Sequence, residues 1–240
     1  MLEISNLVKI YNGEFRAVDD VSLTIGDGEI FGFIGPNGAG KTTTIKSVVG
    51  LIEFEGGTIR FDGLDVAKNR NKVKAKIAYI PDNPEIYDNL TGIQYLNFIG
   101  DICSLDKEAR LKDIEKYVDM FGITKNLGDL VSSYSHGMKQ KLALISAFIR
   151  HPKLLILDEP FVGLDPKASH DVKEVMKNMC EEGNSVFFST HVLEVAEKLC
   201  DKVAIINHGK IVASGTMEEV KGSSSLEEVF LSIANTKEAE

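Results

Sequence analysis

The chain has few cysteines, and they form no pattern. Cys103, Cys180 and Cys200 lie far apart, no C-x-x-C occurs among them, and their number is odd. Metal sites and disulfide frameworks use paired or closely spaced cysteines. We therefore interpret the three as small apolar residues in a reducing compartment.

Long apolar runs are also absent. No stretch approaches the roughly 18 to 20 apolar residues that a membrane-spanning helix requires. The first residues, Met1-Leu2-Glu3-Ile4, place no basic segment before an apolar run, so we expect no signal peptide. If the protein works at a membrane, a partner must hold it there.

Positively charged residues are also fewer than negatively charged ones. The 240 residues include 27 Lys and Arg against 36 Asp and Glu, which gives a formal net charge of -9. An acidic chain is poorly matched to a phosphate backbone, so we expect no nucleic-acid partner. Hydrophobic residues make up 43% of the chain, enough for a large core in one or two domains.

What the chain does contain is a complete phosphate-binding loop. Residues 35–42 read Gly-Pro-Asn-Gly-Ala-Gly-Lys-Thr and match G-x-x-x-x-G-K-T. An apolar run at 30–34 precedes the loop and a helix-like run at 41–51 follows it, which is the context that the motif needs. That context disfavours the alternative, a glycine-rich turn with an incidental lysine. The residues predicted to bind nucleotide here are Gly35, Pro36, Asn37, Gly38, Ala39, Gly40, Lys41, Thr42 and Thr43.

Each residue type in this loop has a chemical role. Glycines let the backbone turn tightly around an anion, so that several N–H groups converge on it, and the following helix adds the positive end of its dipole. Lys41 can reach the terminal phosphates, and the hydroxyl of Thr42 can ligate Mg²⁺.

The first part of the chain indicates antiparallel strands. Strand-like segments at 2–11 and 15–25 are joined at the turn dipeptide Asn12-Gly13, and a third segment covers 58–61. These strands surround the phosphate-binding loop before any strand–helix alternation begins.

Residues from about 83 to 150 indicate a helical block. Thr91 and Gln94 have the spacing of a capping box, Asp106 can cap a second helix, and a third helix begins near Ser135. Because strand-like segments precede and follow the block, we interpret it as an inserted subdomain.

Strands and helices alternate after the block. Further helices are expected at 167–180 and 192–200, and further strands at 185–188, 203–206 and 211–213. The sequence thus predicts an α/β fold, that of a P-loop nucleoside triphosphatase with a mixed core sheet, an N-terminal antiparallel β subdomain and an inserted α-helical subdomain. We expect the main domain to span 1–216 and a short helical tail to span 217–240. The apolar face of that tail consists of Leu226, Val229, Phe230 and Ile233.

Two carboxylates end the continuous apolar run at 154–157. In open α/β sheets ligands bind beyond the carboxyl ends of strands, so Asp158 and Glu159 are placed for chemistry. Successive strand residues point to opposite sides, so we expect different roles. Asp158 suits the Mg²⁺ shell, and Glu159 can act as general base for an attacking water. The alternative is a strand that ends in a solvated acidic turn.

One further segment carries a family resemblance. The sequence Ser-His-Gly-Met-Lys-Gln at 135–140 resembles the signature motif of ATP-binding-cassette (ABC) ATPases. In that family the signature binds the γ-phosphate of an ATP held by the P-loop of a second subunit, which implies this role for Ser135 and Gly137. Gly163-Leu164-Asp165 resembles the family's D-loop, with Asp165 facing the partner.

The resemblance assigns two more residues. His191 matches the switch histidine that contacts the γ-phosphate, and Tyr11 matches the aromatic residue that stacks on adenine. The alternatives are an ordinary polar residue at a strand end and a half-buried strand aromatic. The order and spacing of both residues relative to the P-loop favour the functional interpretation. The implied ligands are ATP and Mg²⁺.

Two positions depart from the family pattern. Asp82 stands where the family usually has glutamine; either it reaches Mg²⁺ or its water, or it only begins a turn. His136 stands in place of the usual second glycine of the signature. The variant signature resembles that of ATPase subunits of ABC-2-type exporters.

The resemblance implies a function that needs partners. We expect two such chains, as a homodimer or a heterodimer, to clamp two Mg-ATP and to drive an integral membrane permease. The permease would dock near Asp82, with Asn83, Ile86 and Tyr87 as candidate contacts. The protein would then be cytoplasmic, peripheral on the inner face of the cell membrane. The transported substrate is not readable, because the membrane subunit selects it.

Two other classes compete with this interpretation. A soluble ABC ATPase that acts on nucleic acid or ribosomes usually carries a coiled-coil insertion or a second cassette, and this chain has neither heptads nor a repeat. An unrelated P-loop enzyme, such as a small-molecule kinase, would need no signature motif.

Overall fold

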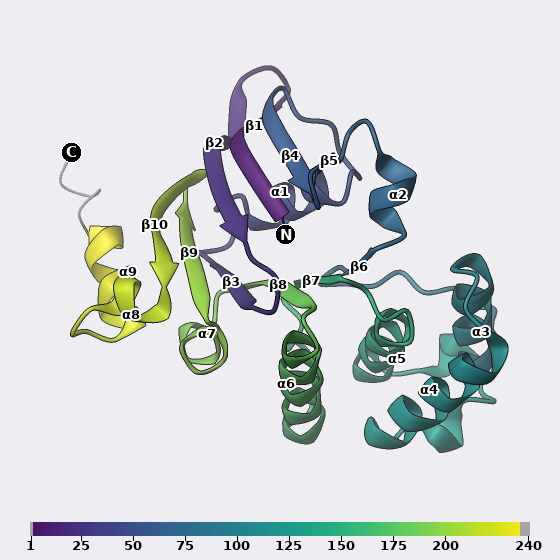
Figure 1. Ribbon diagram of the computed structural model, residues 1–240. Coiled ribbons are helices and arrows are strands. Elements are labelled where there is room, and N and C mark those ends of the chain that lie inside the picture. The colour runs from purple at the N-terminus through teal and green to yellow at the C-terminus, as the bar shows by residue number, and fades with distance from the viewer. Residues whose placement is uncertain (1, 236–240) are drawn as a thin grey trace.

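The computed structural model describes residues 2–235, which form two β-sheets and a set of helices (Figure 1). The smaller sheet is antiparallel and has the strand order β2-β1-β4-β5. Its strands are β1 (Leu2–Tyr11), β2 (Phe15–Ile25), β4 (Gly56–Phe61) and β5 (Leu64–Asp65). The predicted N-terminal antiparallel subdomain is confirmed. The hairpin turn uses Asn12 and Gly13, both at positive φ, as the turn dipeptide predicts.

The larger sheet carries the P-loop. Its strand order is β10-β9-β3-β8-β7-β6, parallel except for the antiparallel pair of β9 and β10, so the predicted mixed core sheet is confirmed. Its strands are β3 (Ile30–Ile34), β6 (Ile77–Ile80), β7 (Leu154–Asp158), β8 (Ser185–Thr190), β9 (Lys202–Asn207) and β10 (Lys210–Thr216). β8 and β10 extend further than the sequence predicts, because their polar ends remain paired with neighbouring strands.

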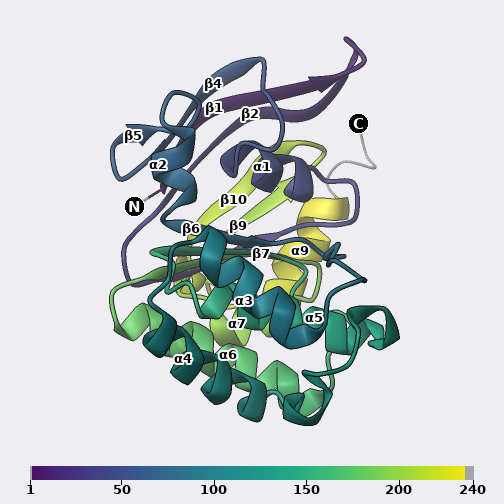
Figure 2. The ribbon, with the colours of Figure 1, turned by 90° about the vertical axis from the view of Figure 1, so that its right-hand side faces the viewer.

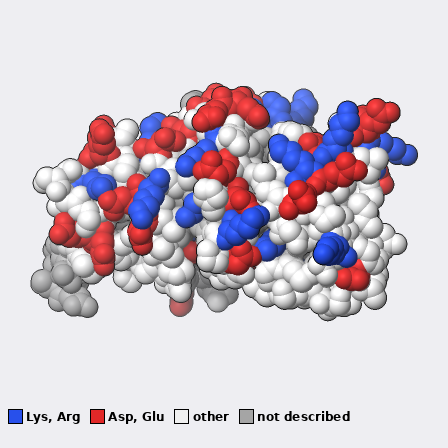
Figure 3. Space-filling model, turned by 90° about the horizontal axis from the view of Figure 1, so that it is seen from below, with Lys and Arg blue, Asp and Glu red and all other residues white. Residues whose placement is uncertain are grey.

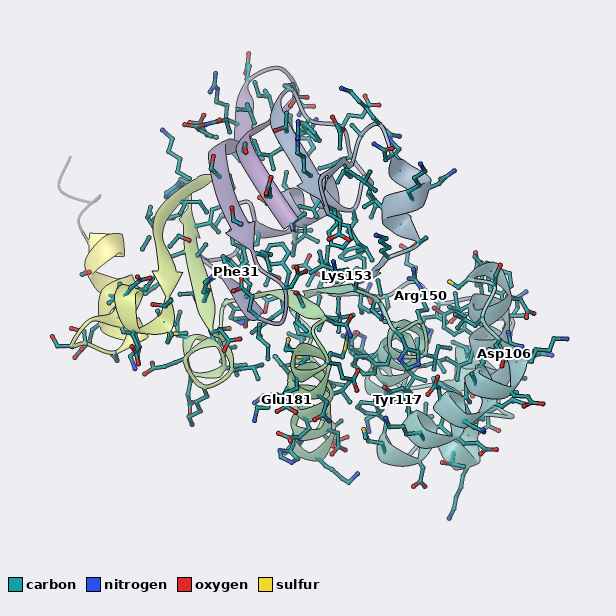
Figure 4. The ribbon with its side chains drawn as sticks, viewed as in Figure 1. Phe31, Asp106, Tyr117, Arg150, Lys153 and Glu181 are labelled. Carbon is teal, nitrogen blue, oxygen red and sulfur yellow. The ribbon has the colours of Figure 1, made fainter. Side chains whose placement is uncertain are left out.

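Apolar residues on both faces of this sheet explain its position between two cores. Phe31 of β3 packs against Phe187 of β8, with 5.9 Å between ring centroids, in a cluster that also holds α1 (Lys41–Val48) and the small sheet. Ile30 and Ile34, which alternate with Phe31, belong to a second cluster under the helices. Phe31 lies near the centre of the molecule in Figure 4. Continuous apolar strands are therefore needed, because each strand is buried on both faces.

The inserted helical block is confirmed between β6 and β7. It contains α3 (Gly92–Ile102), α4 (Lys107–Met120) and α5 (His136–Phe148), with single 3₁₀ turns at Thr124–Asn126 and Val131–Ser133. Thr91 and Gln94 form the predicted capping box, and the Asp106 carboxylate accepts from the N–H groups of Glu108 and Ala109. The block occupies the right-hand side of Figure 1, which faces the viewer in Figure 2.

Two side chains between α5 and β7 connect parts of the fold: Arg150 connects the helical block to the β6 segment, and Lys153 connects the small sheet to the β7 segment. Arg150 donates to the carbonyls of Lys74 at 3.1 Å and Ile77 at 2.8 Å. Lys153 pairs with Asp62 at 2.7 Å. In Figure 4, Arg150 and Lys153 are labelled between the small sheet above and the helical block below.

Helices α6 and α7 and the tail follow the helical block in the chain. α6 (Pro166–Glu181) and α7 (Leu193–Leu199) cover the sheet face opposite α1, and the tail consists of α8 (Met217–Lys221) and α9 (Leu226–Asn235) (Figure 1). Leu226 is fully buried, and Glu197 of α7 pairs with Lys221 and accepts from the N–H of Leu226. The tail therefore packs on α7. The side chain of Ile233 and residues 236–240 lie outside the described part.

The face seen from below carries acidic and basic side chains interspersed (Figure 3). On α6 and α7 these side chains form short-range pairs, such as Glu174 with Lys177 at 3.1 Å and Glu194 with Lys198 at 2.7 Å. Exposed pairs of this kind contribute little to stability, so we interpret them as a solvated surface.

Candidate functional site

The P-loop connects β3 to α1 at the carboxyl end of the sheet. A Cβ at Gly35 would collide with the carbonyl oxygen of Ile206, and Gly40 has a φ of 109°, so both positions require glycine. The loop is held from the β9–β10 turn, where the N–H of Gly209 donates to the carbonyl of Ala39 at 2.9 Å.

A cavity of about 300 Å³ opens beside this loop. Its lining combines P-loop residues with residues from β1, β2 and the ends of β6 and β7. The lining residues are Tyr11, Phe15, Ala17, Pro36, Asn37, Gly38, Gly40, Lys41, Thr42, Thr43, Asp82, Asp158 and Glu159. Most of the residues predicted from the sequence are thus brought together by segments far apart in the chain.

Lys41 is almost fully buried at the floor of the cavity, with 6% of its side chain exposed. Its ammonium donates to the carbonyls of Gly35 at 2.6 Å and Pro36 at 3.2 Å, and lies 3.5 Å from Oε1 of Glu159. An ammonium held inside the loop by its own carbonyls is positioned for the phosphates that the loop would bind.

Asp158 is the last residue of β7, with 1% of its side chain exposed. Its Oδ1 accepts from the hydroxyl of Ser189, the neighbouring residue on β8. Among the described residues, its Oδ2 has no hydrogen-bond partner. A buried carboxylate oxygen without a donor is costly unless a cation or ligand satisfies it, so this oxygen fits a Mg²⁺ ion.

Two further oxygen donors line the same cavity. Thr42 and Asp82 line the cavity with Asp158, and oxygen ligands are those that Mg²⁺ prefers. Within residues 2–235 no group of three or more His, Cys, Asp and Glu side chains could hold a metal by itself. Such a sparse donor set suits an ion that also binds substrate phosphates. Asp82 also accepts from the N–H of Asn83 at 2.9 Å, as expected of a residue that begins a turn, and it lines the cavity, as expected of a metal ligand.

The expected separation of Asp158 and Glu159 by the pleat of the strand is wrong. β7 ends at Asp158, and Glu159 adopts a φ of 49°, outside the strand conformation. Its N–H donates to the carbonyl and to the hydroxyl of Ser189, at 3.2 and 3.1 Å, which fixes the turn. Both carboxylates consequently line the same cavity.

Glu159 and His191 are neighbours. Oε1 of Glu159 lies 3.0 Å from Nδ1 of His191, within ion-pair distance but without hydrogen-bond geometry. His191 directly follows β8, and 48% of its side chain is exposed. His191 does not line the cavity itself, but it contacts the carboxylate that does.

The signature segment lies apart from this cavity. Ser135 is the N-cap of α5, and its hydroxyl accepts from the N–H of Met138 at 3.3 Å, as predicted for a helix start. Neither Ser135 nor Gly137 lines the P-loop cavity. A Cβ at Gly137 would lie 2.8 Å from the carbonyl oxygen of Gly163, so α5 and the D-loop-like turn are in close contact.

Asp165 has two interactions within its own chain. It is the N-cap of α6, with Oδ1 accepting from the N–H of Ala168 at 2.8 Å, and Oδ2 lies 2.7 Å from the ammonium of Lys141 on α5. The bond to Lys141 holds the pKa of the Asp165 carboxyl below its usual range, and the Ala168 N–H adds to this. The sequence predicted a partner-facing residue and missed this link between α5 and α6.

Sequence reasoning missed Ser189 and Phe15. Ser189 holds both site carboxylate segments, but a serine in an apolar strand gives no signal of its own. Phe15 lines the cavity and stands directly opposite Tyr11 in the β1–β2 register, a pairing that the hairpin prediction already contained.

These features define a class of protein, a P-loop ATPase whose parallel strands bring a buried lysine, a buried aspartate and a glutamate to one cavity, with a histidine beside the glutamate. The sequence profile described as "ABC transporter" matches residues 18–162. A second, shorter profile, described as "AAA domain, putative AbiEii toxin, Type IV TA system", matches residues 130–197. The chain belongs to the ABC transporter family, as an ATP-binding, ATP-hydrolysing subunit.

Curated relatives support this membership. The chain is 38% identical over 213 residues to an uncharacterized ABC transporter ATP-binding protein, YhcH of Bacillus subtilis, covering 88% of this chain and 68% of the relative. It is 35% identical over 222 residues to the daunorubicin/doxorubicin resistance ATP-binding protein DrrA of Streptomyces peucetius, covering 92% and 67%. It is 35% identical over 220 residues to the linearmycin resistance ATP-binding protein LnrL of Bacillus subtilis, covering 92% and 70%.

Solved structures share the fold. An ATP-binding subunit of an ABC transporter superposes with a TM-score of 0.93 at 33% identity, covering 98% of this chain and 99% of that one. A dimeric ATP-binding cassette in a post-hydrolysis state, bound to ADP and phosphate, superposes with a TM-score of 0.82 at 22% identity, covering 90% and 99%. The second likeness concerns the fold alone. Within residues 2–235 of the present chain, no helix is long and apolar enough to cross a bilayer.

Proposed function

We propose that this chain binds Mg-ATP in the cavity beside its P-loop and hydrolyses it as one half of an ATPase dimer that drives a membrane permease. The observation that carries the proposal is the convergence of Lys41, Asp158 and Glu159 on one cavity, while the helix start at Ser135 lies outside it. The cavity therefore has a phosphate-binding loop and carboxylates but, among the described residues, no second helix start that could bind the γ-phosphate. A partner chain would supply this helix start.

The chain's own residues divide the chemistry. Thr42, Asp158 and Asp82 would hold Mg²⁺, which when bound neutralises phosphate charge. Lys41 binds the terminal phosphates, and Glu159 orients the attacking water. The water oxygen bonds to the γ-phosphorus, the bond from that phosphorus to the ADP oxygen breaks, and the water's proton passes to Glu159. His191, beside the carboxylate, contacts the γ-phosphate.

Partner docking is assigned to the side that carries α3. Tyr87 and Phe98 form a T-shaped pair with 5.4 Å between ring centroids, and their exposed fractions are 56% and 38%. A cavity of about 210 Å³, lined in part by Pro81, Pro84 and Tyr95, lies next to Asp82. Exposed aromatic rings are typical of protein–protein contacts. A permease bound there would hold the chain at the inner face of the cell membrane.

Export is the direction that the relatives favour. DrrA and LnrL are named for resistance to antibiotics, and the signature variant with His136 resembles that of ABC-2-type exporters. The alternative, a soluble ABC ATPase that acts on nucleic acid or ribosomes, has no specific observation in its favour. Affinity purification from detergent extract separates the two, since one outcome is a membrane subunit and the other ribosomes or DNA.

Substitution of the general base tests the proposal. Glu159→Gln keeps the size of the side chain but cannot accept a proton, so we expect ATP binding to persist and the steady-state ATPase rate to fall by about 10² or more. Because ATP would remain intact, sedimentation with Mg-ATP should show a trapped dimer.

Glu174→Gln on α6 provides the control. Glu174 is an exposed glutamate paired with Lys177 and lies outside the cavity. The ATPase rate of the Glu174→Gln variant should therefore match that of the native chain. A Glu159→Gln variant with near-normal turnover would remove Glu159 from the role of base.

A further inference from the structure

Two aromatic rings from the β1–β2 hairpin belong to the lining of the nucleotide cavity. Tyr11 ends β1, Phe15 begins β2, and the two residues are direct partners in the antiparallel register. Directly opposed residues of an antiparallel pair place their side chains on the same face of the sheet, about 4.5–5.5 Å apart at Cβ. Both rings line the cavity.

The two rings differ in how they are held. The ammonium of Lys9 lies 5.2 Å from the centroid of the Tyr11 ring and is itself fixed by Glu55 at 2.8 Å, so Tyr11 has a cation against it. Phe15 has 62% of its surface exposed, more than Tyr11 with 37%, and contacts no other aromatic ring among the described residues. A phenyl ring this exposed at a cavity gains most from a ligand that covers it.

The polar groups of the cavity come from other segments than these rings. The groups that can bind phosphate or metal come from the P-loop and the strand ends: Lys41, Thr42, Thr43, Asp82, Asp158 and Glu159. The hairpin contributes Tyr11, Phe15 and the small residue Ala17. A ligand in the cavity can therefore meet charged groups of the P-loop and the strand ends, and aromatic surface of the hairpin.

Backbone contact holds the hairpin strand β2 against the P-loop. A Cβ at Gly40 would collide with the carbonyl oxygen of Ala17, so the β2 backbone packs directly on the last turn of the P-loop. Phe15 lies two residues from this contact. The ring is thus carried on a strand that is held against the phosphate-binding loop.

We propose that Phe15 is a second binding surface for the nucleotide base, opposite Tyr11 across the hairpin. The inference rests on the proposed function, because it assumes that the cavity holds ATP. Tyr11 supplies a ring that Lys9 and Glu55 hold in place, and Phe15 supplies apolar area that becomes covered when the base binds. The role needs a flat ring and no hydrogen bond, so tyrosine can replace phenylalanine at this position.

Equilibrium binding of ATP and of inorganic triphosphate, each with Mg²⁺, to the full chain tests the role. Triphosphate has the charges but no base, so a residue that contacts only the base affects ATP alone. We expect Phe15→Ala to weaken ATP binding by about tenfold and to leave triphosphate binding unchanged. Phe15→Tyr should bind ATP as the native chain does, and Leu111→Ala, at an exposed apolar residue on α4, should change neither ligand.

Two results would overturn the inference. Unchanged ATP binding by Phe15→Ala means that the ring does not touch the base, and equal weakening of ATP and triphosphate means that the substitution acts through the shape of the hairpin. A native chain that binds triphosphate as tightly as ATP would refute the base site but leave the phosphate site standing. A native chain that binds neither would refute the proposed function as well.

Discussion

The hydroxyl of Ser189 joins the two carboxylate segments of the site. It donates to Oδ1 of Asp158 and accepts from the N–H of Glu159 at 3.1 Å. The first bond fixes which oxygen of Asp158 remains free, and the second fixes the turn that brings Glu159 into the cavity. Substitution of a group that orients a metal ligand in this way commonly lowers metal affinity or activity by about 10–100-fold.

Removal of this hydroxyl should weaken the use of Mg²⁺. In Ser189→Ala the Oδ1 atom of Asp158 loses its donor, so the carboxylate is no longer held in one orientation. We expect the Mg²⁺ concentration for half-maximal ATPase rate to rise by about tenfold. A Mg²⁺ titration of the ATPase rate measures this.

Ser185→Ala is the matched control for this experiment. Ser185 lies at the other end of β8, is also buried, and its hydroxyl bonds to the backbone of Gly26 and Gly28. It should lose stability to a similar extent without a change in the Mg²⁺ requirement. If the ATPase rates of Ser189→Ala and Ser185→Ala depended on Mg²⁺ concentration in the same way, a role of Ser189 in orienting Asp158 would be contradicted.

Single residues were predictable where a motif fixes their spacing. Lys41 and Thr42 follow from the P-loop pattern, and Asp158 follows from the end of an apolar strand. The side on which Glu159 lies was not predictable, because the pleat rule applies only within a strand and Glu159 has left it with a positive φ. Ser189 was not predictable either, since its role depends on which strand lies beside β7.

At the scale of elements, the start of α6 is tied to α5. Asp165 caps α6 through the N–H of Ala168, and Lys141 of α5 pairs with the same carboxylate. The cap satisfies a helix N–H that would otherwise be unpaired, which contributes about 1 kcal/mol. The ion pair is half-exposed and adds little, but it lowers the pKa of Asp165.

The stabilisation by Asp165 should therefore depend on pH. Because the folded-state pKa is lowered below the unfolded value of about 3.9, the carboxylate stabilises the fold fully above that value and ceases to do so as the pH falls through the folded pKa. Asp165→Ala should lower the free energy of unfolding by about 1 kcal/mol at pH 7, and by less near pH 3. Urea unfolding at both pH values measures this difference.

Asp165→Asn separates the cap from the charge. Asparagine keeps an oxygen that can accept from the Ala168 N–H, so the variant should lose less stability at pH 7 than the alanine variant does. A loss by Asp165→Ala that stayed the same from pH 7 to pH 3 would show that the carboxylate charge plays no part.

Elements were predictable where they are long or capped. The capping box of Thr91 and the cap at Asp106 located α3 and α4, because these side chains bond to N–H groups within the same turn. β5, with two residues, and α2 (Arg70–Lys74), with five, were not predicted. Elements this short contain no full period of apolar residues, so the surrounding structure decides them.

At the scale of the whole molecule, the parts expected to act on ATP are divided between two places. The cavity holds the P-loop, the carboxylates and the aromatic pair, and the helix start at Ser135 lies elsewhere in the same chain. The sequence contains both parts, but sequence spacing does not show whether one chain can bring them together. The structure places them apart, which is the reason for proposing that two chains pair head to tail.

A mixture of two inactive variants tests this pairing. Lys41→Ala should disable the P-loop, and Ser135→Asp should place a negative charge where the γ-phosphate would bind while keeping a good helix N-cap. Each variant alone forms only dimers in which every site has one defective part. In the mixed dimer, one site combines the intact P-loop of the Ser135→Asp chain with the intact signature of the Lys41→Ala chain.

The ATPase rate should therefore be very low for each variant alone and should recover on mixing. If chains pair at random and sites act independently, the recovered rate is up to about a quarter of the native rate. The rate of each variant at doubled concentration is the control. If the mixture shows only the sum of the two separate rates, the nucleotide site is not shared between chains, and the paired mechanism must be given up.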